Sequence, residues 1–585
     1  MSKTKKRILL YSSVVVLALV VATAWFVVSL ESSAQALAET GTGTIQMLNE
    51  VAAGVGALDA DAILAVYDDS YAGETPGAWK EHLESEREGV KVYRWAAHEG
   101  DAEGGRPAMR RQLDSYLSTL RSVEQSKFKL DLVEQIPSAG EAQIRSTLWI
   151  RGTHQSGEAF ESHAHFRMSI RKAGSGWKIT GQTLLRGDTV SGDRRGFTNV
   201  AAASGLDFHS QHNPLFSTPE WDPKQFGIIK YGAGGASAAD YDGDGWYDLL
   251  FLDTKKVRLY HNNGDGTFTD ATTQAGFPEE LGSASVGIFA DLDNDGDKDL
   301  FVGRFTAANM LFRNEGDGTF TDVTEGAGID GYFVTTAAAA DYDGDSLPDI
   351  YAGRYLDPRT KSPTTMFYTR NGEGNLLLRN KGGLRFEDVT ADAGVREGGL
   401  TLGVVWADYD EDGDQDLYVA NDFGRNALFN NQGDGTFADV SLESGAIDFG
   451  FGMSADFGDV DNDGDLDLYV SNVHSSQRWY GQSATLYKYL LTSVRLGTLV
   501  DDLPTYRETF GLLGADWESI GDKMVKGNSL LLNDGTGHFE DAAERAGANP
   551  FGWYWGSAFA DFDNDGRQDI YANNGWITAK SHDDF

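Results

Sequence analysis

The 585-residue chain contains no cysteine, only 12 prolines and far fewer basic than acidic residues. Without cysteine there can be no disulfide, no thiolate-bound zinc and no cysteine nucleophile. The 49 basic residues against 89 acidic ones leave a net charge of −40, which disfavours nucleic acid and anionic lipid surfaces as partners. The 70 glycines, in contrast, indicate many tight turns. A chain of this length is expected to form two or three domains.

The N-terminus predicts export from the cytoplasm. Residues 1–7 form a basic tip that we expect to be cytoplasmic, and residues 8–30 are uncharged and long enough to cross a bilayer as a helix. The bulk would then be periplasmic or extracellular. A cleaved signal peptide, which would release a secreted protein, is the alternative. We favour the transmembrane anchor because the apolar core of a signal peptide is shorter, roughly 7–15 residues.

A small α+β domain is expected over residues 41–190. Apolar residues at helical spacing predict helices over 45–71 and 107–123. Four alternating runs then predict strands near the segments 127–136, 141–152, 159–171 and 176–186. Helices that lead into a four-stranded antiparallel meander resemble the nuclear-transport-factor-like (SnoaL-like) cone fold.

Polar residues gather on one face of the third predicted strand of this domain. His163, His165, Glu161 and Arg167 alternate there with apolar residues of the opposite face. A metal or acid–base role is one interpretation, and a solvated polar face is the other. We favour the solvated face and predict no catalytic residue.

From residue 196 to 585 one pattern recurs six times. Aspartates occupy positions 1, 3, 5 and 9 of a loop, glycine usually occupies position 6, and leucine or isoleucine always occupies position 10. The aspartates are Asp240, Asp242, Asp244 and Asp248; Asp291, Asp293, Asp295 and Asp299; Asp341, Asp343, Asp345 and Asp349; Asp408, Asp410, Asp412 and Asp416; Asp459, Asp461, Asp463 and Asp467; and Asp561, Asp563, Asp565 and Asp569.

This ligand pattern predicts calcium, about one ion per repeat. Carboxylates at positions 1, 3 and 5 of a tight turn converge on one point, and the carboxylate at position 9 closes the shell. A cage of oxygen atoms without histidine or sulfur suits a hard cation, calcium before magnesium. An isolated Asp–Gly turn would be an ordinary hairpin, but six in register favour a metal-binding function.

A second motif, Gly-Asp-Gly-Thr-Phe or a looser version of it, fixes the phase of the repeats. It ends at Phe268, Phe320, Phe386, Phe437 and Phe539, each 21–23 residues before the next leading aspartate. The extra residues of the longer units therefore follow the third and fifth aspartate loops. We expect the second of these, around 475–527, to be a helical insertion.

Each unit of about 50 residues is expected to contain four short strands, for example Leu402–Ala407, Leu417–Asn421, Ala427–Asn430 and Thr436–Val440. Radial repetition of such units predicts a mainly β fold, a calcium-binding β-propeller of six or seven blades after the transmembrane helix and the cone-like domain. All six aspartate loops would lie at one end of it. The sixth unit stops before its closing phenylalanine, so the blade number and the completeness of the C-terminus stay open.

The D-x-D-x-D-G-x-x-D core of residues 196–585 resembles the FG-GAP/VCBS repeat family, which includes the integrin α-subunit head and cartilage acidic protein. The resemblance implies a propeller with calcium in its loops and a role in adhesion or ligand recognition. Ser346 departs from the pattern, because it replaces the glycine of the third loop.

Two functions follow as expectations. The first is a membrane-anchored calcium-binding module that recognises a protein or glycan outside the cytoplasm. The second is a polysaccharide-acting enzyme on the same scaffold. No nucleophile–base pairing in the sequence supports the enzyme, and the calcium loops account for most of the patterned carboxylates. The ligand, the oligomeric state and the role of the α+β domain are not determined by the sequence.

Overall fold

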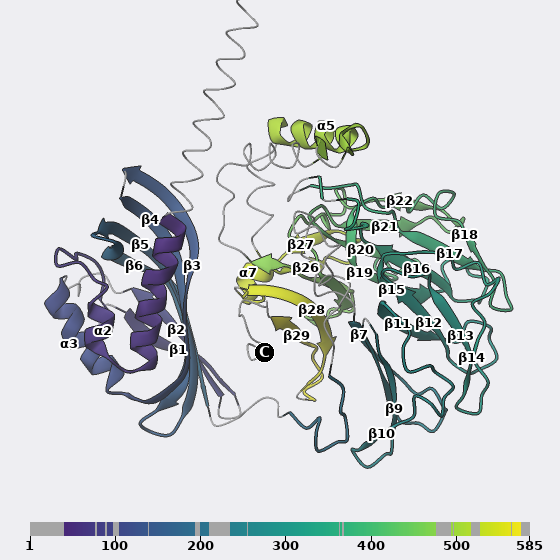
Figure 1. Ribbon diagram of the computed structural model, residues 1–585, viewed down its shortest axis with the longest axis horizontal. Helices are drawn as coiled ribbons and strands as arrows, with labels where there is room; N and C mark the ends of the chain where they lie inside the picture. The colour runs from purple at the N-terminus through teal and green to yellow at the C-terminus, as the bar shows by residue number, and fades with distance from the viewer. Residues whose placement is uncertain are drawn as a thin grey trace, which may run out of the picture. The chain divides into compact units, whose positions relative to one another are not determined.

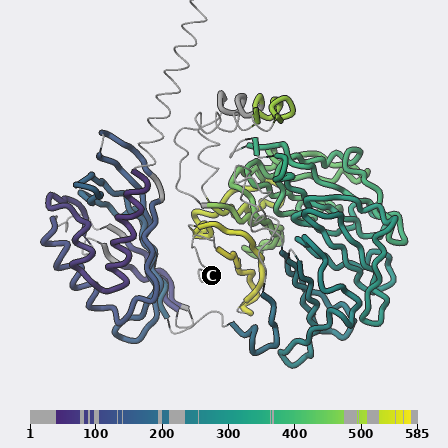
Figure 2. Tube along the Cα trace, viewed as in Figure 1, coloured from purple at the N-terminus to yellow at the C-terminus, as the bar shows by residue number. Residues whose placement is uncertain are grey.

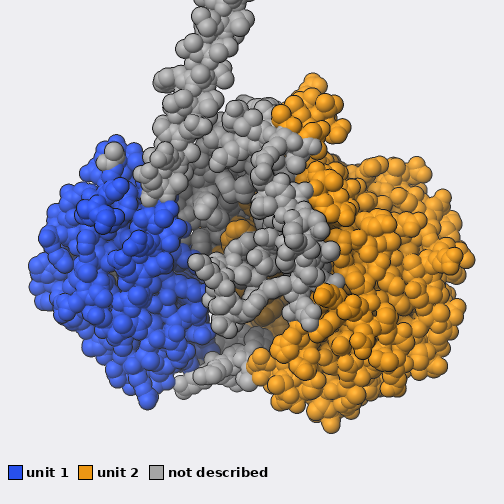
Figure 3. Space-filling view, in the orientation of Figure 1, with its two compact units in different colours: residues 1–198, 476–484 blue, residues 199–475, 485–585 orange. Residues whose placement is uncertain are grey.

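The computed structural model of the protein divides into two compact units, Met1–Thr198 with Ser476–Ala484 and Asn199–Ser475 with Thr485–Phe585 (Figure 3). The structure describes residues 40–75, 79–87, 90–97, 105–138, 140–192, 199–209, 234–253, 255–361, 363–364, 368–474, 493–494, 497–515, 527–550, 552–562 and 564–574.

The first unit is a curved sheet with helices packed on one face (Figure 1). Its six strands are antiparallel and lie in the order β1-β2-β6-β5-β4-β3. Its elements are a helix over 40–56, α2 Ala60–Leu64, β1 Trp79–Arg87, β2 Val90–Ala97, α3 Arg106–Leu117, β3 Leu120–Ser138, β4 Glu141–His154, β5 Ala159–Ala173 and β6 Gly176–Gly192.

The α+β outline of this unit agrees with the sequence prediction, with two differences. The helix expected over 45–71 is interrupted, because Leu58 has a φ of 54° and the Asp59 side chain accepts hydrogen bonds from the Asp61 and Ala62 amides to begin α2. The sheet also contains the hairpin β1–β2, which the sequence analysis did not assign.

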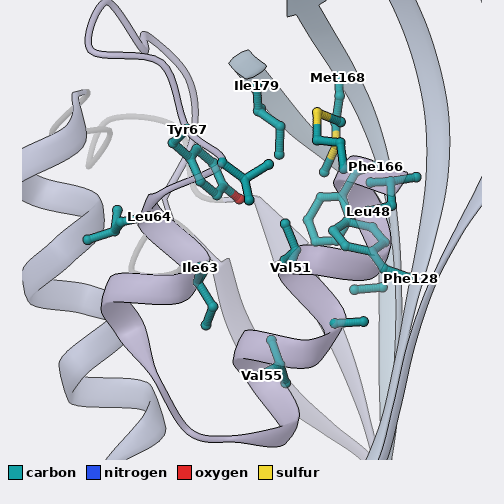
Figure 4. Packing of buried hydrophobic residues seen from close by; sticks show 14 of the residues in the cluster. Leu48, Val51, Val55, Ile63, Leu64, Tyr67, Phe128, Phe166, Met168 and Ile179 are labelled. Atoms are coloured by element: carbon teal, nitrogen blue, oxygen red, sulfur yellow. The ribbon is translucent and has the colours of Figure 1, made fainter. Parts of the chain in front are cut away.

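A single apolar core holds the first unit together (Figure 4). Leu48, Val51 and Val55 of the first helix and Ile63 of α2 pack toward Phe128, Phe166 and Ile179 of the sheet. The alternation on β5 causes this packing, because Phe160, Ala164, Phe166, Met168 and Ile170 all point to the helix side.

The second unit consists of four-stranded antiparallel sheets followed by a three-stranded one (Figures 1 and 2). The four-stranded sheets are β7 Gly234–Ala239, β8 Asp248–Asp253, β9 Val257–Asn262 and β10 Phe268–Asp270; β11 Ala284–Ala290, β12 Asp299–Arg304, β13 Met310–Asn314 and β14 Phe320–Asp322; β15 Val334–Ala340, β16 Asp349–Arg354, β17 Leu376–Asn380 and β18 Phe386–Asp388; β19 Leu400–Ala407, β20 Asp416–Asp422, β21 Ala427–Asn431 and β22 Phe437–Asp439; and β23 Ser454–Gly458, β24 Asp467–Ser471, β26 Ser529–Asn533 and β27 Phe539–Asp541. The three-stranded sheet is β25 Val473–His474, β28 Gly552–Ala560 and β29 Asp569–Asn574, and the helices are α5 Leu499–Ala515 and α7 Ala543–Ala546.

Neighbouring sheets pack through their first strands, in the order β7, β11, β15, β19, β23 and β28. Side chains of these strands bond the next sheet: the Ser237 hydroxyl donates to the Gly287 carbonyl, and the Ser285 hydroxyl donates to the Val334 carbonyl. Apolar side chains from each pair of sheets fill the space between them, as Leu250 and Leu300 do in the first pair. The prediction of four short strands per repeat is confirmed for the first five repeats, whereas the described part of the sixth contains the two strands β28 and β29.

The predicted fold class is wrong in its closed propeller and its transmembrane helix, although the fold is mainly β. Within the part of the chain that the structure describes, the sheets stay separate, and no packing comparable to that between neighbours joins β28 to β7, so the ring of a β-propeller is not closed. Nor does any described helix have the length and apolarity needed to cross a membrane. The expected anchor at 8–30 and the cytoplasmic tip at 1–7 lie outside the described residues.

The two long insertions are attached at the same end of the second unit. Both follow the second strand of a sheet, the first between β16 and β17 and the second between β24 and β26. The aspartate loops join first and second strands, so they lie at the opposite end. The second insertion contains α5, and the Asn371 amide donates to the Asp502 carboxylate of this helix across 3.3 Å.

Candidate metal loops

Each aspartate loop turns twice through the left-handed region of backbone conformation. Position 6 has a positive φ in every repeat, and position 4 does as well. Position 6 is Gly245, Gly296, Ser346, Gly413, Gly464 and Gly566, and position 4 is Gly243, Asn294, Gly344, Glu411, Asn462 and Asn564. The need for glycine at position 6 was predicted, whereas the second requirement at position 4 was not, although glycine or asparagine stands there in five loops.

The aspartates at positions 1 and 5 shape the turn itself. In the third loop, Asp341 accepts hydrogen bonds from the Asp345 and Ser346 amides at 3.1 and 2.8 Å. Asp345 then accepts one from the Leu347 amide at 2.9 Å. The other five loops repeat the bonds to the amides of positions 6 and 7. These bonds fold the carboxylates inward.

The aspartate at position 9 is buried at the start of the second strand and is held on both sides. Asp349 accepts from the Asn380 amide at 2.7 Å and from the Tyr342 amide at 3.2 Å. Its counterparts Asp248, Asp299, Asp416 and Asp467 accept the same two bonds. Despite these bonds, burial raises the pKa of Asp349 to about 7 and that of Asp416 to about 8. The charged form of these carboxylates therefore needs a further positive partner.

The aspartate at position 3 most often has an unsatisfied oxygen. One side-chain oxygen, Oδ1, is buried and accepts no hydrogen bond in Asp293, Asp343 and Asp410, and the same holds for Asp408 at position 1 of the fourth loop. Burial, followed by the charge of the neighbouring position-5 aspartate, raises the pKa of each of the three position-3 carboxyls. A buried carboxylate oxygen without a hydrogen-bond donor destabilises the fold, because it has lost its hydrogen bonds to water and no protein donor replaces them.

The donor set fits a hard cation. Three carboxylate oxygens, one from each residue, lie within 4.8 Å of one another in Asp240, Asp242 and Asp244, in Asp291, Asp293 and Asp295, in Asp341, Asp343 and Asp349, and in Asp408, Asp410 and Asp416. In each of these four loops the structure brings three of the four predicted aspartates together. In the sixth loop, Asp563 lies outside the described residues, and the bonds of Asp561 and Asp565 follow the common scheme. Asp569 differs from the other position-9 aspartates, because it is exposed and accepts a hydrogen bond from the Phe562 amide alone among the described residues.

Sequence reasoning missed an asparagine that bonds its own loop and, from the second repeat on, the preceding loop as well. It ends the third strand of each four-stranded sheet, as Asn262, Asn314, Asn380, Asn431 and Asn533. The Asn380 side chain donates to the Pro348 carbonyl of its own loop and to the Leu292 carbonyl of the preceding loop. Each of these asparagines stands six residues before a closing phenylalanine, so the fixed spacing was a usable signal.

The first unit encloses a cavity of about 650 Å³ between its helices and the concave face of the sheet. Apolar side chains such as Leu113, Phe128 and Leu148 form most of its lining. Glu81 and His154 add polar groups.

The polar residues considered on β5 lie outside this cavity. His163 lies between two carboxylates, with Nδ1 3.5 Å from Asp188 and Nε2 3.4 Å from Glu161. His165 contacts the Thr147 hydroxyl at 2.8 Å, and Arg167 pairs with Glu134. These pairs engage the polar groups with their neighbours on the same face of the sheet.

Comparison with known proteins agrees with the repeat geometry. The family model of the FG-GAP-like repeat matches residues 240–302, 291–352, 408–470 and 518–572. Cartilage acidic protein 1 from Mus musculus is 23% identical over 383 residues, which cover 59% of this chain and 58% of that protein. The Homo sapiens protein is 23% identical over 325 residues, covering 51% and 48%. The chain thus spans about half the length of the curated relatives it matches.

Solved structures align with each unit at low scores. A putative scytalone dehydratase from Novosphingobium aromaticivorans is 12% identical over 28% of this chain and 92% of that one, with a TM-score of 0.21. An Agrocybe aegerita lectin that recognises non-reducing terminal N-acetylglucosamine is 16% identical over 65% of this chain and 75% of that one, with a TM-score of 0.28. We draw no functional argument from these two alignments. The family match rests on the repeats, because FG-GAP-like repeats are found at residues 240–352, 408–470 and 518–572.

Proposed function

We propose that the second unit is an extracytoplasmic recognition or adhesion module that binds about one Ca²⁺ per repeat in its aspartate loops. The observation that carries the proposal is the buried, unbonded Oδ1 atom of Asp293, Asp343 and Asp410. Each of these atoms belongs to a cluster of carboxylates, and a divalent cation is the partner that would satisfy it and neutralise its neighbours together. FG-GAP-like repeats and the similarity to cartilage acidic protein 1 support the extracellular recognition role.

Calcium suits the loops better than other cations. Backbone carbonyls and water would complete the six to eight oxygen ligands that Ca²⁺ prefers, while Mg²⁺ demands a stricter octahedron. Most of the positions 1 to 6 of the loops are exposed or half-buried, which suits an ion that exchanges with solvent. Sites of this kind fill at the calcium concentrations found outside the cytoplasm.

The insertion-bearing end is the best candidate for the ligand surface, and the ligand would be a protein or a glycan. Long loops on a rigid scaffold commonly carry binding function. In this end, the Thr369 amide bonds the Phe423 carbonyl at 2.7 Å, and Tyr355 donates to the buried carboxylate of Asp422 at 2.7 Å. The first insertion is thus attached to the neighbouring sheet rather than extending freely.

Counting bound calcium tests the metal part of the proposal. Asp343→Asn and Asp410→Asn should each reduce by one the equivalents of Ca²⁺ retained in equilibrium dialysis, because each removes the charge of one position-3 ligand. Asp265→Asn is the matched control: Asp265 also lies in an Asp–Gly turn, but it only accepts bonds from Thr267. A chain that retains no Ca²⁺ at millimolar concentration would overturn the proposal.

Ligand capture tests the recognition part. A glycan array and a pull-down from an extracellular matrix or envelope extract should give hits that a chelator removes. Replacing residues 476–526 by a short linker should abolish these hits while the calcium equivalents stay unchanged. Turnover of a polysaccharide on the array would instead favour the enzyme alternative.

The cavity of the first unit favours a second candidate function, the binding of a small apolar ligand. A volume of about 650 Å³ and a mostly apolar lining match a typical ligand pocket. Leu148→Trp should fill the cavity and abolish the uptake of a fluorescent apolar probe. Leu185→Trp is the control, because Leu185 is exposed and lies outside the lining. Equal probe uptake in both variants would count against the cavity as a binding site.

A further inference from the structure

We infer that the first aspartate loop differs from the others and takes a first-row transition-metal ion, such as Zn²⁺ or Co²⁺, through the imidazole of His261. This inference rests on the proposed function, because it assumes that the loops bind divalent cations. It concerns one side chain that stands beside the loop and was not part of the predicted ligand pattern.

His261 occupies the strand position immediately before Asn262, the last residue of β9. The corresponding residues of the next repeats are Arg313, Arg379, Asn430 and Leu532. A side chain at this position can contact the aspartate loop of its own repeat. In the fourth repeat, the side-chain amide of Asn430 donates to the position-3 carboxylate of Asp410 across 2.8 Å. Among these five residues, only the imidazole offers a lone pair on nitrogen at that place.

The imidazole stands among the carboxylates at the spacing of a coordination shell. His261 Nδ1 is 3.0 Å from Oδ2 of Asp242 and 3.4 Å from Oδ1 of Asp248. Two ligands at about 2.1 Å from one ion are about 3.4 Å apart at the tetrahedral angle that zinc prefers, and about 3.0 Å apart at a right angle. Asp242, Asp248 and His261 therefore have the separations of three ligands on one ion.

The Nδ1 atom lacks the hydrogen bond that its distance to Asp242 would allow. It is buried and has no hydrogen-bond partner, whereas Asn430 in the fourth repeat bonds its aspartate directly. A simple histidine–carboxylate hydrogen bond would satisfy this nitrogen. An ion placed between the nitrogen and the two carboxylates would satisfy the nitrogen and neutralise both carboxylates.

The chemistry of the donors then selects the metal. Imidazole suits zinc, copper, iron and nickel, whereas calcium takes oxygen ligands. One nitrogen and two carboxylates raise the preference of the first loop for first-row ions. At the equivalent position, Arg313 and Arg379 bring a permanent positive charge, which cannot ligate a cation, so their loops lack this preference.

Cobalt is the probe that separates this loop from the rest. The full chain, saturated with Ca²⁺, is titrated with Co²⁺, and the visible absorption of bound Co²⁺ is recorded. His261→Asn, which copies the fourth repeat, should weaken the tightest Co²⁺ site at least about 10-fold, since even the loss of an outer-shell partner costs that much. Asn430→His, which copies the first repeat, should create a second site.

His163→Asn is the control, because His163 also lies between two carboxylates, on the sheet of the first unit. It should leave the tightest site unchanged. If Ca²⁺ binds normally but His261→Asn does not alter Co²⁺ affinity, the inference is wrong and the calcium proposal stands. If Co²⁺ binds through His261 in a chain that binds no Ca²⁺, the inference stands and the calcium proposal fails. Equal displacement of Ca²⁺ from every loop would also overturn the inference.

Discussion

The two units of this chain achieve stability in different ways. The first unit has one continuous apolar core, in which helices and a single curved sheet bury side chains such as Leu48, Ile144 and Phe166. The second unit has a series of smaller clusters, each shared by two neighbouring sheets, and at one end it carries loops rich in buried carboxylates. A core of the first kind needs no ion. In the second unit, the negative charge of the loop carboxylates remains to be neutralised. The stability of this unit should therefore depend on the divalent cations in the solution.

Removal of calcium should produce the largest difference between the units. At a free Ca²⁺ concentration 100 times the dissociation constant, each site stabilises the native state by about 2.7 kcal/mol. The loss of several sites therefore outweighs the whole stability of many domains. In calorimetry of the full chain, excess chelator should strongly lower the melting temperature of the second unit. The melting temperature of the first unit should stay unchanged.

The control for this experiment restores Ca²⁺ after the metal content has been measured. The second transition should return to its original temperature. If the chelator shifts both transitions equally, or neither, the contrast between an apolar unit and an ion-dependent unit is not valid.

A truncation in the core of the first unit should give the reverse pattern. Leu48 is fully buried among the helices and the sheet, so Leu48→Ala removes apolar contacts and leaves a cavity. Such changes cost about 2–5 kcal/mol. The melting temperature of the first unit should fall by the same amount in Ca²⁺ and in chelator. The shift also identifies which calorimetric transition belongs to this unit, and a calcium-dependent loss would contradict the separation of the two.

A smaller difference should appear in the dependence on pH. Burial lowers the pKa of His163, but the hydrogen bonds and charges of Asp188 and Glu161 outweigh it and raise the pKa to about 9 from 6.5. A raised histidine pKa stabilises the folded state fully below pH 6.5, and this contribution is lost as the pH rises to 9.

His163→Asn should therefore flatten the fall in melting temperature of the first unit between pH 6.5 and 9. The effect is modest, because about two fifths of the His163 side chain is exposed. The second unit, measured in saturating Ca²⁺ in the same scan, should be unaffected by the substitution. An unchanged pH slope would show that the three charged groups do not act together.

The sequence predicted the repeats well because their physics is local. Aspartates at fixed positions fold their own loop, and the strand of Asp416–Asp422 begins where position 9 ends the turn. The prediction was weakest where distant residues decide. The closure of a ring depends on contacts between the first and last sheets, which are far apart in the sequence. Strand β1 was missed for another reason: it carries the charged residues Lys80, Glu81, Glu84 and Glu86, and only its pairing with β2 identifies it as a strand.

The candidate metal site shows the same limit. The 24 aspartates follow from spacing, but the roles within each loop do not. Only the structure distinguishes a position-9 carboxylate that backbone amides hold from a position-3 carboxylate with an oxygen that accepts nothing. His261 was missed for a related reason, since it is 13 residues from the end of the motif and reaches the loop only because β9 pairs with β8.

The smallest expected effect compares two loops of the second unit. Position 6 of the third loop is Ser346, with a φ of 72°, whereas the fourth loop has Gly413 at 95°. The left-handed region costs a residue with a side chain about 1 kcal/mol relative to glycine. Since the loop must adopt this conformation to gather its ligands, Ser346→Gly should tighten Ca²⁺ binding at the third loop by up to about fivefold. Gly413→Ser is the reciprocal change: a Cβ there meets nothing within 4 Å, so only the backbone preference is altered, and the fourth site should weaken by a similar factor. Titration calorimetry of both variants checks the pair, and changes of the same sign would show that backbone strain at position 6 does not set the affinity.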